Sequence, residues 1–324
     1  MKSSRFLVWL ILCIAAGHPV HALTARQYPD QVIKLVVPFP PGGTSDSVAR
    51  ILAKGLGERL GQSVIIENKG GAGTIIGTQY VAGRPPDGYT LLWITTPFAI
   101  NDSLFRKLPY DTFRDFTPVV DIVQVPLVLI VNSSSPAKSL SDIVKAAKND
   151  PGKLTFGSSG IGGSPHLATE MFESAENIKL THVPYQGSAP SLIGLLSDQT
   201  DMIFDTLFLT YPQIKQGKAR AIAQTGAIRS ALLPDVPTMA EAGVAGYEAT
   251  SWLSVAVRSG TPAEIVQRLN LVSNEVLESK DFKEAVLQQG LQIIGGSSAN
   301  SEAHLRTEID KWKRVIREAE IPQQ

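Results

Sequence analysis

The sequence predicts an α/β fold of two lobes, each a mostly parallel sheet flanked by helices, with a cleft between them. Short runs of β-type residues alternate with amphipathic helical patterns from residue 32 onward, which is the order that parallel strands require. The 324 residues exceed what one typical hydrophobic core contains. The 27 glycines and 21 prolines are spread along the chain, as expected of turns between many short elements.

The first lobe begins with a β-α-β-α-β series. We expect strands at 32–38, 63–67 and 90–95, with helices at 47–60 and 73–82 between them. The helix at 47–60 places its apolar side chains on one face, namely Val48, Ile51, Leu52, Leu56 and Leu60. This order favours parallel strands with helices on both faces of the sheet.

A second series of strands and helices fills the middle of the chain. We expect strands at 127–131, 154–157, 180–184, 202–205 and 219–225, and helices at 139–148, 165–174, 188–197 and 211–216. Ser139 and Asp142 have the spacing of a capping box. Near residue 261 the chain becomes mainly helical, with Thr261 as N-cap and Pro262 at the first helical position. Helices at 280–289 and 301–319 complete the chain.

The order of elements indicates how the lobes are divided. We expect residues 29–124 and 249–324 to form the first lobe, and residues 125–248 to form a second lobe inserted into it. The two crossings, near 121–126 and 247–253, would act as a hinge.

The N-terminus has the layout of a secretory signal peptide, residues 1–22. Lys2 and Arg5 precede an apolar run of about 11 residues, and Val20 and Ala22 supply the small residues of a cleavage site. A membrane anchor would need ~20 apolar residues. Cys13 is the single cysteine, and bulky Leu12 before it argues against a lipoprotein signal. We therefore expect a periplasmic protein without disulfides or thiolate chemistry.

Two glycine-rich loops have one physical design. In residues 37–46 and 156–166 a strand ends, glycines follow, and a helix begins. Glycines let the backbone approach a ligand, and the free N–H groups of a helix start favour an anion. We expect one loop in each lobe, facing across the cleft. The candidate contacts in these loops are Phe39, Pro41, Gly42, Gly43, Thr44, Asp46, Ser158, Ser159, Gly160, Gly162, Ser164 and His166.

Three further candidates lie at other strand ends or on the cleft wall: Thr96, Tyr185 and Asp205. A carboxylate at the end of the apolar strand 202–205 is costly unless it is paired. Asp205 therefore binds a ligand ammonium, caps the following turn or contacts a hinge amide, and these alternatives stay open. For Asp46 a role as helix N-cap or first-turn residue competes with ligand contact. Phe39, Tyr185 and Trp252 fit the cleft wall and the core equally well.

The sequence lacks the motifs of most enzyme classes. Ile161 breaks the G-x-S-x-G spacing after Gly157, no phosphate-binding P-loop occurs, and Ile76 replaces the third glycine of a dinucleotide fingerprint. The histidines outside the leader, His166, His182 and His304, lack metal-ligand spacing. With 30 basic and 30 acidic residues the chain offers no basic surface for nucleic acid. We expect no cofactor, metal or catalysis.

The two loops and several further segments resemble the Bug receptors, the periplasmic solute-binding proteins of tripartite tricarboxylate transporters. The similar segments are 38–46, 67–73, 85–92, 157–162, 182–187, 233–238 and 241–243, which cover nearly all of the mature chain in order. The resemblance implies a two-lobed periplasmic-binding fold, type II-like, that closes on a di- or tricarboxylate, an acidic amino acid or an aromatic acid. The two loops would hold this ligand through main-chain amides, hydroxyls and waters.

Two departures from the family concern the ligand. The segment 95–101 differs from the small, polar one expected there, and we expect Phe98 to narrow the cleft. Leu253 and Ser254 replace an aromatic residue and a glycine. The partner is either a membrane transporter or, as an alternative, a membrane sensor kinase. A periplasmic hydrolase using Ser159 or Ser164 with His166 is a weaker alternative. We expect a monomer.

Overall fold

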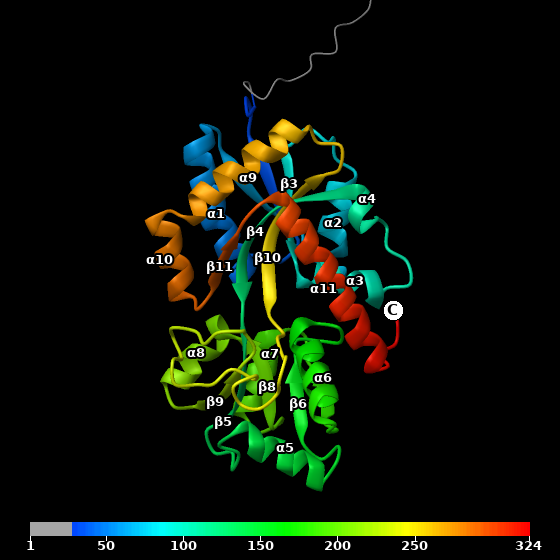
Figure 1. Cartoon of the computed structure of the whole chain (residues 1–324), viewed down its shortest axis with the longest axis vertical. Helices are drawn as coiled ribbons and strands as arrows, with labels where there is room; N and C mark the ends of the chain where they lie inside the picture. The colour runs from blue at the N-terminus through cyan, green and yellow to red at the C-terminus, as the bar shows by residue number, and fades with distance from the viewer. Residues whose placement is uncertain (1–27) are drawn as a thin grey trace, which may run out of the picture.

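The computed structural model describes residues 28–324, whose strands form two sheets that follow one another along the long axis of the molecule (Figure 1). The signal peptide predicted at 1–22 lies outside the described residues. The first sheet has the order β11-β4-β10-β3-β1-β2, and the second β7-β6-β8-β5-β9. The strands of the first sheet are β1 (Ile33–Val37), β2 (Val64–Asn68), β3 (Thr90–Thr95), β4 (Phe116–Val125), β10 (Ser251–Arg258) and β11 (Gln292–Gly295). Those of the second are β5 (Leu127–Asn132), β6 (Thr155–Ser158), β7 (Thr181–Pro184), β8 (Met202–Thr206) and β9 (Ala219–Gln224).

Both sheets combine parallel and antiparallel pairs. β1 is parallel to β2 and β3, and β6 is parallel to β7 and β8, as the sequence predicts. β10 is antiparallel to β3 and β4, and β5 is antiparallel to β8 and β9. β5 and β10 adjoin the points where the chain crosses between the sheets, and the crossing reverses their direction. The two-lobed α/β fold is therefore confirmed, but with mixed sheets.

Helices flank both sheets. Around the first sheet lie α1 (Thr44–Leu60), the 3-10 turn η1 (Ala72–Thr74), α2 (Ile75–Ala82), α3 (Thr96–Leu104), α4 (Thr112–Asp115), α9 (Ala263–Leu277), α10 (Lys280–Gln288) and α11 (Ser298–Glu318). Around the second lie α5 (Leu140–Asn149), α6 (Ser164–Glu176), α7 (Ser188–Leu196) and α8 (Leu207–Lys215). α11 runs from the first lobe towards α6 of the second (Figure 1). Within residues 28–324 none of the helices combines the length and apolar character that a membrane crossing needs.

Local sequence features account for most helix boundaries. Ser139 and Asp142 form the predicted capping box of α5, and Ser297 forms another at α11, which therefore starts earlier than predicted. The start of α9 was predicted one position too early: Pro262 is its N-cap and Ala263 its first helical residue. The sequence reading missed α3 entirely, although Pro97 in its first turn is a favourable helix start.

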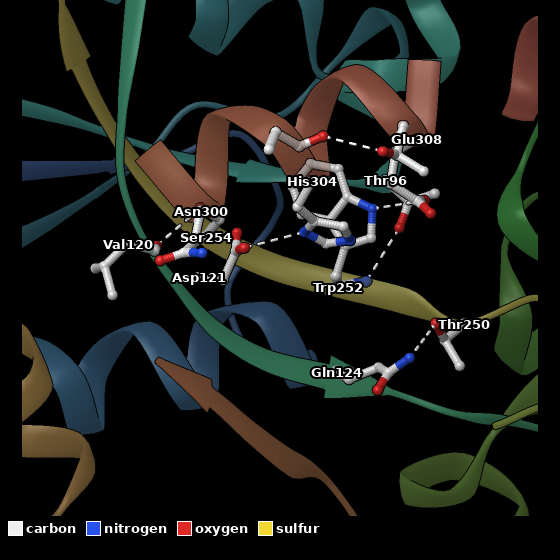
Figure 2. Close-up of polar contacts among 12 residues, drawn as sticks. Thr96, Val120, Asp121, Gln124, Thr250, Trp252, Ser254, Asn300, His304 and Glu308 are labelled. Carbon is white, nitrogen blue, oxygen red and sulfur yellow. Dashed lines mark hydrogen bonds and ion pairs between the residues drawn. The ribbon is translucent and has the colours of Figure 1, made fainter. Parts of the chain in front are cut away.

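The chain crosses between the sheets at Pro126, between β4 and β5, and returns before β10. Figure 2 shows the polar contacts at this junction. The indole N–H of Trp252 on β10 donates to Oε2 of Glu308 on α11 at 2.8 Å, and both residues are labelled in Figure 2. The indole N–H of Trp312, also on α11, donates to the same oxygen at 2.9 Å. Lys311 pairs with the other oxygen of Glu308. This carboxylate, with its side chain 6 % exposed, ties the C-terminal helix to a crossing strand.

Further contacts extend the same junction (Figure 2). The backbone N–H of Trp252 donates to Thr96 Oγ1 at 3.1 Å, and His304 Nδ1 lies 3.0 Å from Asp121 Oδ2. Gln124 Nε2 donates to Thr250 Oγ1 at 2.6 Å, which joins β4 to the approach of β10. Each of these polar side chains has a bonded partner, as buried polar groups require.

Candidate ligand-binding cleft

A cavity of about 230 Å³ lies between the two sheets. The first lobe lines it with Phe39, Thr44, Ser45, Thr95, Pro97, Ser251 and Leu253, and Val125 lines it at the crossing between the lobes. The second lobe lines it with Leu127, Ser159, Gly163, Ser164, Pro165, Ser188, Asp205 and Thr206. A ligand here would touch both lobes, and its size would match a small organic acid.

The helices that reach this cavity share one feature at their starts. α1, α3, α6, α7 and α8 each contribute a residue of the N-cap or first turn to the lining. None of these five starts has a side-chain cap, whereas the side-chain caps of the described helices occur at α4, α5, α10 and α11, away from the cavity. Uncapped backbone N–H groups and the helix dipoles therefore favour an anion at these helix starts without a basic side chain.

Two hydroxyl groups on the first lobe are available to a ligand. Ser45 Oγ accepts from Trp93 Nε1 at 2.8 Å, which leaves its own proton free to be donated. Thr95 is only 3 % exposed, and its Oγ1 has no hydrogen-bond partner. Because a buried polar group without a partner is costly, this hydroxyl marks a place where a ligand or water belongs.

Asp205 supplies the ionisable side chain of the lining. It is the penultimate residue of β8 and 1 % exposed, and its Oδ1 accepts from the backbone N–H of Thr206 at 2.7 Å. Its Oδ2 has no partner. Burial raises the pKa of this carboxyl to about 6, and the Ser188 hydroxyl and the Thr206 amide limit the rise.

The first glycine-rich loop divides into contact and support residues. Phe39 and Thr44 line the cavity as predicted, whereas Pro41, Gly42 and Gly43 are exposed beside it. Asp46 does not line the cavity.

The Asp46 carboxylate is committed to the loop itself. It accepts from the Gly42 N–H at 3.0 Å, from Arg50 Nε at 2.9 Å and from Asn68 Nδ2 at 2.9 Å. Although burial opposes it, these bonds hold the pKa of Asp46 below its ordinary value. The structure thus places Asp46 in the first turn of α1, where it supports the loop, and Gly43 rather than Asp46 is the N-cap.

The second loop divides in the same way. Ser159 and Ser164 line the cavity, but Gly160 and Gly162 do not, and the Ser158 hydroxyl is buried. Ser158 Oγ lies 2.6 Å from His182 Nε2 and also accepts from the Gly160 N–H at 3.1 Å. The Ser158 hydroxyl therefore stabilises the loop on its buried side.

His166 belongs to this supporting layer. It is 4 % exposed, its Nδ1 accepts from the Gly162 N–H at 3.1 Å, and its Nε2 lies 3.2 Å from Glu170. Its ring stacks on that of His182 at 4.1 Å between centroids. Burial and the neighbouring His166 lower the pKa of His182 to about 4, so this histidine is neutral at pH 7.

The other predicted contacts lie outside the lining. Thr96 is fully buried, and its hydroxyl accepts from Trp252 N at the junction of the lobes. Tyr185 is partly buried, and its hydroxyl faces Gln199. The expectation that Phe98 narrows the cleft is wrong, because its ring is 1 % exposed and packs on Tyr110 and Phe116 in the core.

The sequence reading missed most lining residues that begin helices: Ser45, Thr95, Pro97, Gly163, Pro165, Ser188 and Thr206. It also missed Val125, Leu127 and Ser251, which, like the Leu253 already named as a departure from the family, come from the strands that join the lobes. A usable signal exists for the first group, because each follows a strand and lies at the N-cap or first turn of a helix. The second group becomes recognisable only when the crossing strands are placed.

Comparison with known proteins identifies relatives over most of the chain. Residues 48–321 match the model of the family described as the tripartite tricarboxylate transporter family receptor. The protein BugT of Bordetella pertussis is 35 % identical over 98 % of this chain and 98 % of its own length. The structure of Rhodopseudomonas palustris Rpa4515 with adipate has a TM-score of 0.83 and 38 % identity, and covers 92 % of this chain and 100 % of that one. MatC of the same organism with bound malate has a TM-score of 0.78 and 29 % identity, with coverage of 89 % and 100 %.

Proposed function

We propose that this chain, which belongs to the family of tripartite tricarboxylate transporter receptors, captures a small carboxylate between its lobes for uptake by a membrane transporter. Members of this family are solute-binding receptors. The observation that carries the proposal is the set of five uncapped helix starts around one cavity between the lobes. The adipate and malate bound by two relatives are anions of the size that this cavity admits.

The proposed mechanism is closure of two lobes on the ligand. Residues 29–124 with 249–324 act as one lobe, and residues 125–248 as the other. The ligand carboxylate accepts hydrogen bonds from the starts of α1 and α6, which lie on different lobes. Such a ligand favours the closed arrangement because only there can it contact both helix starts. The transporter then recognises the closed receptor.

Among the residues predicted from the sequence, five are proposed to touch the ligand: Phe39, Thr44, Ser159, Ser164 and Asp205. The exposed loop residues Pro41, Gly42 and Gly43, with Gly160, are proposed to approach it on closure. Asp46, Ser158, Gly162 and His166 hold these loops in shape. The protein is proposed to be a periplasmic monomer, delivered there by the leader at 1–22.

A hydrolase at this site finds no support in the geometry. Both ring nitrogens of His166 are engaged, by the Gly162 N–H and by Glu170, so His166 has no nitrogen left for Ser159 or Ser164. The close pair of Ser158 and His182 is buried, because the Ser158 side chain is 1 % exposed and does not line the cavity. A substrate would have no access to that hydroxyl.

A thermal-shift panel tests the proposal. The mature protein is first unfolded and refolded to remove any co-purified ligand, and then titrated with mono-, di- and tricarboxylates, acidic amino acids and aromatic acids. A captured carboxylate raises Tm with concentration. The matched control is the diol of equal length, which keeps the carbon chain and lacks the charges. If no carboxylate raises Tm more than its diol does, the proposed function is wrong.

A further inference from the structure

Two buried polar atoms of the cavity lack a partner, one on each lobe. Thr95 Oγ1 belongs to the first lobe and Asp205 Oδ2 to the second. A hydroxyl can either donate or accept, but an ionised carboxylate only accepts. Thr95 Oγ1 can therefore be satisfied by a donor or an acceptor on the ligand, whereas Asp205 Oδ2 requires a donor.

The surroundings of Asp205 offer it no cation. The lining contains no lysine, arginine or histidine. Asp205 pairs with Val128 on β5, the Thr206 amide donates to its Oδ1 from the start of α8, and the Ser188 hydroxyl lies near it on α7 without bonding to Oδ2. None of these elements presents a charged side chain to it, and no charged residue contributes to the shift of its pKa. Asp205 thus faces the cavity as an uncompensated acceptor.

A ligand that fills this cavity has to suit both the helix starts and Asp205. Its carboxylate suits the starts of α1 and α6, where backbone N–H groups are free. A second bare carboxylate beside Asp205 Oδ2 would bring two like charges together in a buried place. A hydroxyl or an ammonium group would instead give this oxygen its missing hydrogen bond.

We propose that the ligand is a carboxylate that also carries a hydrogen-bond donor, a hydroxyl or an ammonium group, and that Asp205 selects it by accepting from that donor through Oδ2. This inference rests on the proposed function and narrows it to hydroxy and amino carboxylates. Asp205 is then a specificity-determining residue, and the hydrogen bond from the Thr206 N–H to its Oδ1 fixes its orientation.

Calorimetric titration with matched ligands tests the inference at pH 7.5. Succinate, malate and aspartate differ only in the hydrogen, hydroxyl or ammonium at one carbon, and glutarate, 2-hydroxyglutarate and glutamate repeat the series with a longer chain. We expect the best donor-bearing ligand to bind at least about tenfold more tightly than its bare counterpart. Asp205→Asn, which keeps the shape and removes the charge, should reduce that ratio several-fold. Asp198→Asn, an exposed aspartate outside the cavity lining, is the control and should leave it unchanged.

The outcomes separate this inference from the function on which it rests. Bare dicarboxylates that bind as tightly as their donor-bearing counterparts overturn the inference and leave carboxylate capture intact. So does an Asp205→Asn variant with an unchanged ratio. Failure of every carboxylate to bind wild type defeats both proposals.

Discussion

Asp205 and Glu308 are two buried carboxylates with opposite surroundings. Asp205 is 1 % exposed in the cavity and has an oxygen without a partner. Glu308 is 5 % exposed at the junction of the lobes, where two indole N–H groups and Lys311 satisfy it. Asp205 can therefore accept a hydrogen bond from a ligand, whereas the carboxylate of Glu308 is already paired within the protein.

The same contrast extends to the elements around each carboxylate. The helix starts at the cavity lack side-chain caps, whereas α11 at the junction begins with a capping box at Ser297. Unpaired polar groups cost stability and persist where a ligand completes them. Paired ones fix neighbouring parts of the fold to one another.

Removal of Glu308 should have the largest effect on stability. Glu308→Ala leaves two buried indole N–H groups and Lys311 without their acceptor, so we expect the free energy of unfolding to fall by about 3 kcal/mol or more. Urea denaturation measures this. Glu302→Ala, which removes an exposed partner of Arg306 from the same helix, is the control and should cost under about 0.5 kcal/mol. Equal losses in the two variants would contradict the role given to Glu308.

Bulk at Gly43 should weaken binding more than it weakens the fold. Gly43 has an extended backbone (φ −87°, ψ 174°) and no atom within 4 Å of the position of an added Cβ. We expect Gly43→Val to lower affinity at least about tenfold by blocking approach to the start of α1, with less than about 1 kcal/mol of lost stability. Calorimetry measures the affinity, and urea denaturation of the same sample measures the stability. Unchanged affinity would remove this loop from the site.

Replacement of Asp205 should stabilise the ligand-free protein. Folding raises the pKa of this carboxyl from 3.8 to about 6. Below about pH 4 the group is protonated in the folded and the unfolded protein and costs no stability. Above about pH 6 it is ionised in both, and the buried charge then lowers the free energy of unfolding by its full amount. Asp205→Asn should therefore raise the free energy of unfolding by about 1–2 kcal/mol at pH 8. The gain should shrink as the pH falls from 6 towards 4. A loss of stability at pH 8 would show that the carboxylate has a partner within the fold.

The smallest expected effect distinguishes two adjacent serines. Ser159 lines the cavity, whereas the Ser158 hydroxyl is bonded beneath the loop to His182 and Gly160. Ser159→Ala should weaken ligand binding by about 0.5–1.5 kcal/mol with unchanged stability. Ser158→Ala should instead lower stability by a similar amount. Both variants need calorimetry and denaturation, and the reverse assignment of effects would contradict the division of the loop.

The sequence predicted the parts of the fold that depend on local patterns. Short runs of β-type residues located β1–β3, and the apolar face of α1 is buried at Val48, Leu52, Leu56 and Leu60. The crossing strand β10 and the edge strand β11 carry no such local pattern. β10, which is as buried as the predicted β3, has Ser254 within its apolar run, and β11 has only four residues.

For the site, the sequence located the loops but not the direction of each side chain. Phe39, Thr44, Ser159, Ser164 and Asp205 line the cavity, because a glycine-rich strand-to-helix turn predicts the place where a ligand approaches. Whether a given polar residue faces the ligand or supports the loop depends on partners distant in sequence. Asp46 is held by Asn68, and Ser158 by His182, and neither pairing is visible before the chain folds.

A crystal structure of the mature protein with its tightest carboxylate tests the central claim most directly. The account predicts a ligand carboxylate in the cavity between the sheets, within hydrogen-bond distance of backbone N–H groups in the first turns of both α1 and α6. A ligand held by one lobe alone, or bound elsewhere on the protein, would contradict it.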